Sequence, residues 1–224
     1  MTQETLTVGD RTTTLRLASP AEASGAGVVV LHPWWGLNGD VVDYCDRLAA
    51  AGFAVAAPDL YEGRLATTVE EAERLATELD GDVGDDFALA AVDVLAAATG
   101  YRGARIAALG FSMGAPRALW LPAHRDAVVA SVVYYGTIVD PSLSQAHTPV
   151  LGHFAEDDDY EPEEAVAALE AALREAGREA ELHRYPGTGH WFAEPSRDTY
   201  VPTASEEAFA RTVAFLRREL LEKA

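Results

Sequence analysis

The sequence predicts an α/β fold in which a mostly parallel central sheet is covered by helices on both faces. Short runs of continuous apolar, β-branched residues alternate with longer amphipathic stretches, which is typical of parallel strands joined by helical crossovers. No internal repeat, low-complexity tract or Pro/Ser-rich linker interrupts this pattern, so we expect one domain over residues 1–224. The predicted strands and helices account for the chain without a long insertion, so we expect no large lid.

The expected elements follow one another along the chain in a regular order. The apolar runs predict strands over residues 27–33, 53–60, 104–112, 127–136, 148–155 and 179–187. The periodic stretches predict helices over residues 40–51, 69–79, 85–98 and 162–176, one after Gly114, and a final helix. That last helix carries four apolar residues on one face: Phe209, Val213, Leu216 and Leu220. Thr203 and Glu206 have the spacing of a capping box at its start, and the more polar TTTLRLA near the N-terminus predicts an edge strand.

Composition and charge limit the classes of function. The formal net charge is −19, and the positive residues are arginines scattered among acids, with Lys223 the only lysine. Without a basic patch, such a chain is expected to bind neither nucleic acid nor an anionic membrane. No signal peptide is evident, and no apolar run approaches the roughly 20 residues of a membrane span. The single cysteine, Cys45, shares a helical face with apolar neighbours, so we expect a core residue in a cytoplasmic protein.

A serine stands between two glycines where the third apolar run ends. The stretch Gly110-Phe111-Ser112-Met113-Gly114 matches G-x-S-x-G and lies between a predicted strand and a predicted helix. This is the context of a nucleophile elbow, a tight turn that lifts a serine hydroxyl above a sheet. The alternative interpretation is a turn that needs small residues and holds an uninvolved serine.

A serine hydroxyl needs a base, and His190 is the best candidate among six histidines. It lies in YPGTGHWF, in a glycine-containing loop directly after the last predicted strand. His32 closes the first core strand but is better placed to brace the loop that follows. His124, His147 and His183 lack both the glycine flanks and the position.

The base in turn needs a carboxylate to fix its tautomer and stabilise its charged form. The segment GHFAEDDDYEP follows the fifth strand and offers four acids: Glu156, Asp157, Asp158 and Asp159. A solvated loop that caps the next helix is the alternative reading of these acids. The order serine, acid, histidine along the chain is that of the α/β-hydrolase fold, so we predict that fold with Ser112 as nucleophile.

These motifs together resemble those of the dienelactone hydrolase family. The resemblance extends over most of the chain and includes HPWWGLN, PDLYEGR, the elbow, the acidic segment and YPGTGHWFAE. It implies Asp158 as the triad acid, since that residue lies four before Pro162 and five after His153; Asp157 is the second choice. It also implies an oxyanion hole formed by the amides of Met113 and Trp34.

Three positions depart from the family pattern. The family's well-known enzymes carry cysteine at the elbow, where this chain has Ser112, and a glutamate where this chain has Pro33. The two changes agree with each other, because a serine activated directly by His190 does not need the additional carboxylate. The family's H-x-F-A-R places an arginine for a substrate carboxylate, but here the position is Glu194. We therefore expect Glu194 to contact substrate and to favour neutral or cationic esters over dienelactone.

The predicted function is hydrolysis of small, soluble esters or lactones by a serine esterase. Trp35 and Trp191, with Trp34, flank the proposed site and are expected to wall the substrate pocket, although packing over the sheet explains each of them as well. No cluster at metal-ligand spacing is present, so we expect no metal or cofactor. The alternatives are other acyl chemistry on the same triad (thioesterase, acyltransferase or peptidase) and a non-catalytic, hydrolase-like binding protein. The sequence does not predict an oligomeric state.

Overall fold

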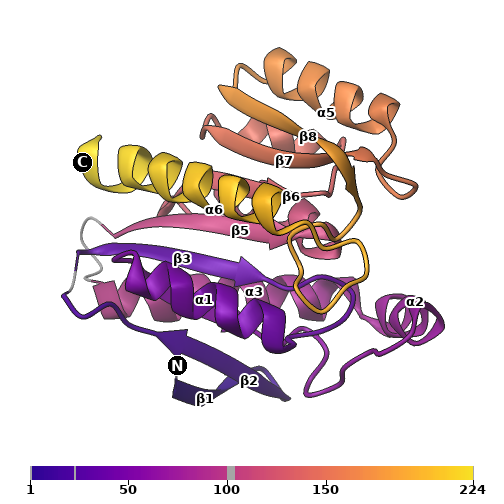
Figure 1. Ribbon diagram of the computed structural model, residues 1–224. Helices are drawn as coiled ribbons and strands as arrows, with labels where there is room; N and C mark the ends of the chain where they lie inside the picture. Colours follow the sequence, from indigo (N-terminus) through magenta and orange to yellow (C-terminus); the bar gives the residue numbers. More distant parts are fainter. Residues whose placement is uncertain (1, 23, 100–103, 224) are drawn as a thin grey trace.

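The strands form one eight-stranded sheet in a computed structural model that describes residues 2–22, 24–99 and 104–223 (Figure 1). The spatial order is β1-β2-β4-β3-β5-β6-β7-β8. The strands are β1 (Thr2–Val8), β2 (Arg11–Ala18), β3 (Ala26–Leu31), β4 (Ala54–Pro58), β5 (Arg105–Phe111), β6 (Val128–Tyr134), β7 (Val150–Asp157) and β8 (Ala180–Gly189). The six strands from β3 to β8 run parallel, which confirms the predicted α/β fold.

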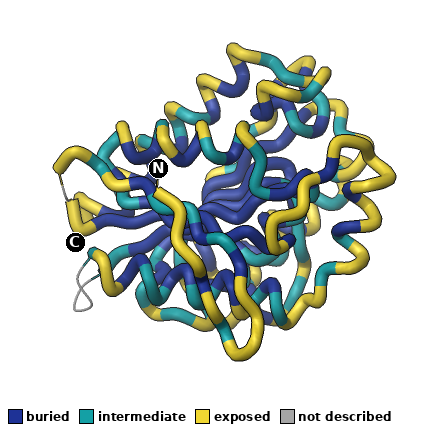
Figure 2. Tube along the Cα trace, turned by 90° about the horizontal axis from the view of Figure 1, so that it is seen from below, coloured by how far each residue is buried: buried dark blue, intermediate teal, exposed yellow. Residues whose placement is uncertain are grey.

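Helices cover both faces of the sheet. The helices are α1 (Gly39–Ala50), α2 (Val69–Glu78), α3 (Gly81–Thr99), α4 (Ala115–Trp120), α5 (Glu163–Glu175) and α6 (Pro202–Arg217). In β3, Val28 and Val30 pack with α1 and α6 on one face, whereas Val29 and Leu31 pack with α3 and α4 on the other. Because successive strand residues point to opposite faces, a fully apolar strand has to be covered on both sides. Figure 2 shows the resulting buried centre beneath an exposed outer layer.

The N-terminal hairpin corrects one sequence-based expectation. TTTLRLA forms most of β2, but this strand is not the edge, since it pairs antiparallel with β1 on one side and β4 on the other. The edge strand is β1, for which the sequence predicted no strand and in which five of seven residues are exposed. A two-residue turn, Gly9-Asp10, joins β1 to β2, and Gly9 has a φ of 59°. Such a Gly-Asp pair between alternating residues is a hairpin signal.

The start of α6 corrects a second expectation. The capping box of Thr203 and Glu206 is not formed: Val201 is the N-cap and makes no side-chain capping hydrogen bond. Pro202 occupies the first helical turn, where its missing N–H costs nothing and its fixed φ suits the helix. Thr203 therefore already lies inside the helix.

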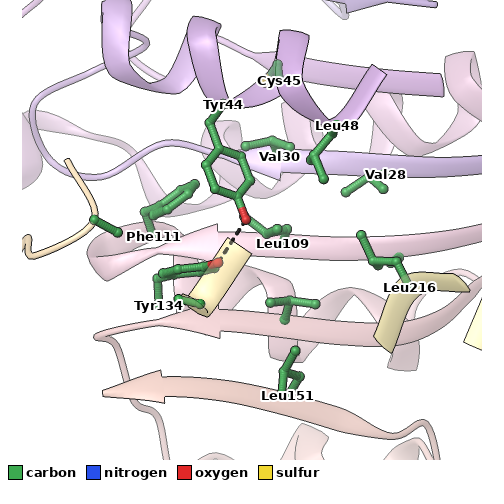
Figure 3. Close-up of a cluster of buried hydrophobic side chains, with 14 of the residues drawn as sticks. Val28, Val30, Tyr44, Cys45, Leu48, Leu109, Phe111, Tyr134, Leu151 and Leu216 are labelled. Atoms are coloured by element: carbon green, nitrogen blue, oxygen red, sulfur yellow. Dashed lines mark hydrogen bonds between the residues drawn. The ribbon is translucent and has the colours of Figure 1, made fainter. Parts of the chain in front are cut away.

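A polar network crosses the apolar interior between α1, the sheet and α6. The Tyr44 and Tyr134 hydroxyls lie 2.9 Å apart, and Tyr134 lies 2.8 Å from the Thr212 hydroxyl (the Tyr44–Tyr134 contact is drawn in Figure 3). Cys45 is fully buried beside them, and burial raises the pKa of its thiol, which confirms it as a core residue. The hydroxyls of two buried aromatic residues are thus hydrogen-bonded within a core of mostly aliphatic side chains.

Among the helices that the structure describes, none is both long and apolar enough to cross a membrane.

Candidate active site

Ser112 lies at the turn between β5 and α4, in the geometry of a nucleophile elbow. It is the first residue of a short 3₁₀ turn, Ser112–Gly114, and its φ is 46°, in the left-handed region that non-glycine residues rarely adopt. A Cβ at Gly110 would lie 2.3 Å from the Gly114 carbonyl oxygen, and one at Gly114 would lie 2.4 Å from the Leu31 carbonyl oxygen. Both flanking positions therefore require glycine, and the backbone turn presents a partly exposed serine.

His190 follows β8 and contacts Ser112 directly. Its Nε2 lies 2.9 Å from the Ser112 Oγ, and its Nδ1 lies 2.9 and 2.8 Å from the two carboxylate oxygens of Asp158. A carboxylate only accepts hydrogen bonds, so Nδ1 carries the proton and Nε2 is the acceptor that faces the serine hydroxyl. His190 is in the tautomer that a general base requires.

Asp158 is held rigidly just beyond the end of β7. Its Oδ1 accepts hydrogen bonds from the amides of Tyr160 (2.9 Å) and Glu161 (3.0 Å), and its carboxylate is buried. The other acids of this segment point elsewhere: Asp157 is exposed, and Glu156 accepts from the amide of Gly187. Asp158, and not Asp157, is the acid that the structure brings to His190.

Backbone strain is concentrated around these residues. Four described non-glycine residues have a positive φ, and three of them lie at this edge of the sheet: Ser112, Tyr135 (36°) and Trp191 (66°). Residues in this region cost about 1–3 kcal/mol each and persist where surrounding contacts hold them, commonly at active sites. The three positive φ values indicate that surrounding contacts hold the backbone in one conformation at the carboxyl ends of these strands.

The amides of Met113 and Trp34 are the candidate oxyanion donors. Met113 lies in the first turn of a helix, where amides have no partner within the helix. The Gly36 amide closes a turn with the Pro33 carbonyl (3.1 Å), and Trp34 is the second residue of that turn, so its amide takes no part in the closing hydrogen bond. Both amides are thus left available by their local geometry.

His32 braces the loop that carries Trp34, as the sequence predicted. Its Nδ1–H donates to the Pro33 carbonyl (2.6 Å), and its Nε2 accepts from the Leu60 amide (3.0 Å). Burial lowers the pKa of the imidazole, which agrees with this neutral hydrogen-bonding pattern. His32 therefore fixes a loop and is not a second base.

Aromatic side chains surround the His190 ring. Tyr160 and Trp191 each lie 5.0 Å from it between ring centroids, and Trp34 stacks on Trp191 at 5.9 Å. Tyr160 is 48% exposed, and Trp34 and Trp191 are partly exposed, so these three rings form an accessible wall. Trp35 is only 3% exposed and packs beneath them, although it borders, with Trp191, a neighbouring cavity of about 300 Å³.

Glu194 does not lie where contact with a substrate would require. Its side chain is 3% exposed, and its Oε1 accepts a hydrogen bond of 2.9 Å from the Tyr135 hydroxyl. Oε2 is buried without a hydrogen-bond partner in the part of the chain that the structure describes. Burial raises the pKa of this carboxyl to about 8. The position matched to the family's arginine therefore holds a buried carboxyl beneath the site.

Two residues of this edge, Tyr135 and Tyr160, were missed from the sequence. Both contact the imidazole, since each ring centroid lies 5.0 Å from that of His190. Tyr160 could have been found as an aromatic residue two positions after the acid. Tyr135 follows a strand end, but nothing local predicts which strand lies beside that of Ser112. Within the described ranges, no three His, Cys, Asp or Glu side chains form a group that could hold a metal ion.

Comparisons with known proteins agree on one family. The model of the dienelactone hydrolase family matches residues 14–220. Protein usf of Aquifex pyrophilus is 30% identical over 206 residues, which cover 88% of this chain and 89% of that protein. A protein of Escherichia coli (strain K12) named "Putative carboxymethylenebutenolidase" is 30% identical over 220 residues, covering 90% and 80% of the two chains. The crystal structure of a "Putative Dienelactone Hydrolase" from Klebsiella pneumoniae subsp. pneumoniae superposes with a TM-score of 0.81 at 25% identity, covering 97% and 98%.

Proposed function

The chain belongs to the dienelactone hydrolase family of ester and lactone hydrolases, and from that premise we propose a serine hydrolase of small carboxylic esters or lactones. The observation that carries the proposal is an unbroken series of hydrogen bonds from Ser112 through His190 to Asp158. All three side chains follow strands that end at the same edge of a parallel sheet, where α/β proteins bind their ligands.

The first half-reaction forms an acyl-enzyme. His190 Nε2 takes the proton of Ser112 while the serine oxygen attacks the ester carbonyl carbon, and the carbonyl oxygen becomes the oxyanion. The amides of Met113 and Trp34 donate to that oxyanion, at about 3–4 kcal/mol per donor in comparable sites. The C–O bond to the alcohol then breaks, and His190 returns its proton to the leaving oxygen.

The second half-reaction releases the acid. His190 takes a proton from water, the hydroxide attacks the acyl carbon, and the serine oxygen leaves with the proton from His190. Asp158 stabilises the imidazolium that forms in each half, and the amides of Tyr160 and Glu161 keep its carboxylate in place. The cycle needs no group besides those of this chain and water.

The aromatic wall favours small substrates with an apolar part. Trp34, Tyr160 and Trp191 offer exposed ring surface beside His190 for an acyl or alcohol group, and Trp35 supports this surface from below. The expected preference for neutral or cationic esters depended on Glu194 facing the substrate. Because that carboxyl is buried, it gives no support for excluding a substrate carboxylate.

We place this reaction in the cytoplasm. The only cysteine of the chain is buried and unpaired, so the fold uses no internal disulfide. A protein that depends on no disulfide suits a reducing compartment.

Hydrolysis of p-nitrophenyl acetate tests the proposal. Ser112→Ala should lower kcat/KM at least 10³-fold with an unchanged circular dichroism spectrum and Tm, because the acyl acceptor is lost and the fold is not. Retention of activity by this variant would overturn the assignment of the nucleophile. A panel with competing thiol, alcohol and amine acceptors separates esterase activity from other acyl chemistry, and complete inactivity of the wild type on every ester would favour a binding protein.

A further inference from the structure

Tyr135 connects the catalytic serine and histidine through the end of a single strand. It is the first residue after β6, its ring centroid lies 5.0 Å from that of His190, and its φ of 36° is strained. The next residue, Gly136, packs on the elbow so closely that a Cβ there would lie 2.5 Å from the Ser112 carbonyl oxygen. The backbone beside Ser112 and the ring against His190 thus belong to consecutive residues.

Glu194 links the loop that carries His190 to Tyr135. It belongs to the loop that begins at His190, and its amide donates to the Trp191 carbonyl (2.9 Å). Its Oε1 accepts a hydrogen bond from the Tyr135 hydroxyl, and the Tyr135 side chain in turn contacts the His190 imidazole. The loop from His190 to Glu194 and these two contacts therefore form a closed circuit. The hydrogen bond between the buried Tyr135 and Glu194 side chains fixes the loop after His190 relative to the end of β6.

We propose that Glu194 and Tyr135 form a positioning pair that holds the His190 imidazole in line with Ser112. The role of the pair rests on the proposed function. Neither side chain reaches the reacting atoms, so neither is a catalytic residue. Substrate is expected to bind on the exposed rings of Trp34, Tyr160 and Trp191, which are not part of the pair. Loss of the pair should therefore lower kcat and leave KM nearly unchanged.

The charges around Glu194 are consistent with a neutral acid that accepts from a neutral phenol. Tyr135 faces it from just beyond the end of β6, Asp40 and Tyr44 border the same small cavity from α1, and Arg197 lies in its own loop. Burial, and to a smaller extent Asp40, raise the pKa of Glu194, whereas the hydrogen bond from Tyr135 and the charge of Arg197 lower it. Burial and the neighbouring Glu194 raise the pKa of Tyr135. An uncharged pair needs no countercharge in this interior.

Three single variants and one double variant test the pair on the full chain. Glu194→Leu and Tyr135→Phe should each lower kcat about 30-fold on p-nitrophenyl acetate with less than threefold change in KM, and the double variant should be no worse than either single one. Glu194→Gln keeps an oxygen acceptor for the tyrosine and should recover most of kcat. Tyr185→Phe is the matched control, because it removes a hydroxyl bonded to the interior His153 and should leave kcat unchanged.

The proton on His190 Nδ1 supplies a readout that does not depend on turnover. Its downfield ¹H NMR signal, assigned by its loss in His190→Ala, should broaden in Glu194→Leu and Tyr135→Phe and stay sharp in Glu194→Gln. A kcat within threefold of wild type in folded Tyr135→Phe, or multiplicative losses in the double variant, would overturn the pair. Activity retained by Ser112→Ala would instead overturn the proposed function, and the NMR comparison would still decide whether the pair positions His190.

Discussion

Two histidines, His153 and His190, are both held by hydrogen bonds at both ring nitrogens, yet the surroundings suit them to opposite tasks. His153 is 0% exposed, and its nitrogens contact the hydroxyls of Tyr185 (2.8 Å) and Thr212 (3.0 Å). His190 is 5% exposed and lies between the Asp158 carboxylate and the Ser112 hydroxyl. Burial lowers the pKa of His153 well below the usual range, and the positive charges of His183 and Arg211 lower it further.

The difference between the interior and the edge shows what turns a buried imidazole into a candidate base. Burial and two hydrogen bonds are common to both rings. His190 has in addition the Asp158 carboxylate, which two backbone amides hold, and the Ser112 hydroxyl, which lies on a strained, partly exposed turn. A proton can be accepted only where the resulting charge is stabilised and a reacting group can reach it.

The largest expected effect separates the two histidines directly. His190→Ala should lower kcat/KM about 10⁴- to 10⁶-fold with little change in the free energy of unfolding. His153→Ala should leave kcat of the folded protein nearly intact but lower the free energy of unfolding by about 2–4 kcal/mol, since it empties a buried site and removes one hydrogen-bond partner each from Tyr185 and Thr212. Ester hydrolysis and urea unfolding of both variants measure this contrast, and equal effects on either quantity would contradict it.

The second effect concerns the carboxylate that distinguishes the edge. Asp158→Asn should lower kcat about 10⁴-fold, because an amide favours the wrong imidazole tautomer and does not stabilise the imidazolium. The neighbouring exposed acid supplies the control, and Asp157→Asn should stay within twofold of wild type. A normal Asp158→Asn and an impaired Asp157→Asn in the same assay would move the role of the acid by one residue.

The sequence was sufficient for those features that depend on strand ends. Parallel strands end at one edge, so Ser112, His190 and one acid of residues 156–159 could be expected to meet there. Which acid faces the imidazole depends on how the loop turns after β7, and only the resemblance to a family selected Asp158. Tyr135 could not be predicted, because its contact with His190 depends on β6 lying between β5 and β7, and strand order leaves no local signal.

Glu194 shows the same limit for a loop. The family pattern predicts contact with substrate at this position, four residues after His190, but the loop turns the side chain inward. The predictions of β2 as an edge strand and of the capping box of α6 are wrong for a related reason: strand pairing and the entry angle of a helix are set by tertiary contacts. The periodic spacing of apolar residues predicts which face of a helix or strand is buried. A loop has no such regular spacing, so its sequence does not predict which side chains point inward.

The third effect is a pH dependence of the free energy of unfolding, to which Glu194 beneath the site and His153 in the interior contribute in opposite directions. The pKa of Glu194 is raised from 4.5 to about 8, so the folded state holds a proton that the unfolded state has lost between those values. Stability from this residue therefore falls as pH rises from about 4.5 to about 8, by about 5 kcal/mol, and is constant outside that window. His153 has a lowered pKa, so its contribution is lost in the opposite direction, as pH falls below about 6.5.

Urea unfolding of wild type and Glu194→Gln at pH 5 and pH 8 measures this effect. The amide does not titrate, so the variant should gain stability relative to wild type as pH rises. A difference between the two proteins that is the same at both pH values would show that folding does not raise the pKa of Glu194.

The smallest effect concerns the aromatic wall. Trp191→Ala should lower kcat/KM for p-nitrophenyl butyrate about tenfold, since it removes ring surface beside His190. Trp120 stacks on His124 in α4 and its following turn, away from this wall, so Trp120→Ala should leave kcat/KM unchanged. Equal losses in both variants would indicate a general structural effect in place of a substrate contact.

Covalent labelling tests the central claim, that His190 activates the Ser112 hydroxyl at the sheet edge, more directly than any turnover assay. Intact-protein mass spectrometry after treatment with a fluorophosphonate, followed by peptide mapping, should find a single phosphonyl adduct on the peptide that contains Ser112. The adduct should be absent from Ser112→Ala and should form at least 10³-fold more slowly in His190→Ala. An adduct on another residue, or labelling of Ser112 at the same rate without His190, would contradict the claim.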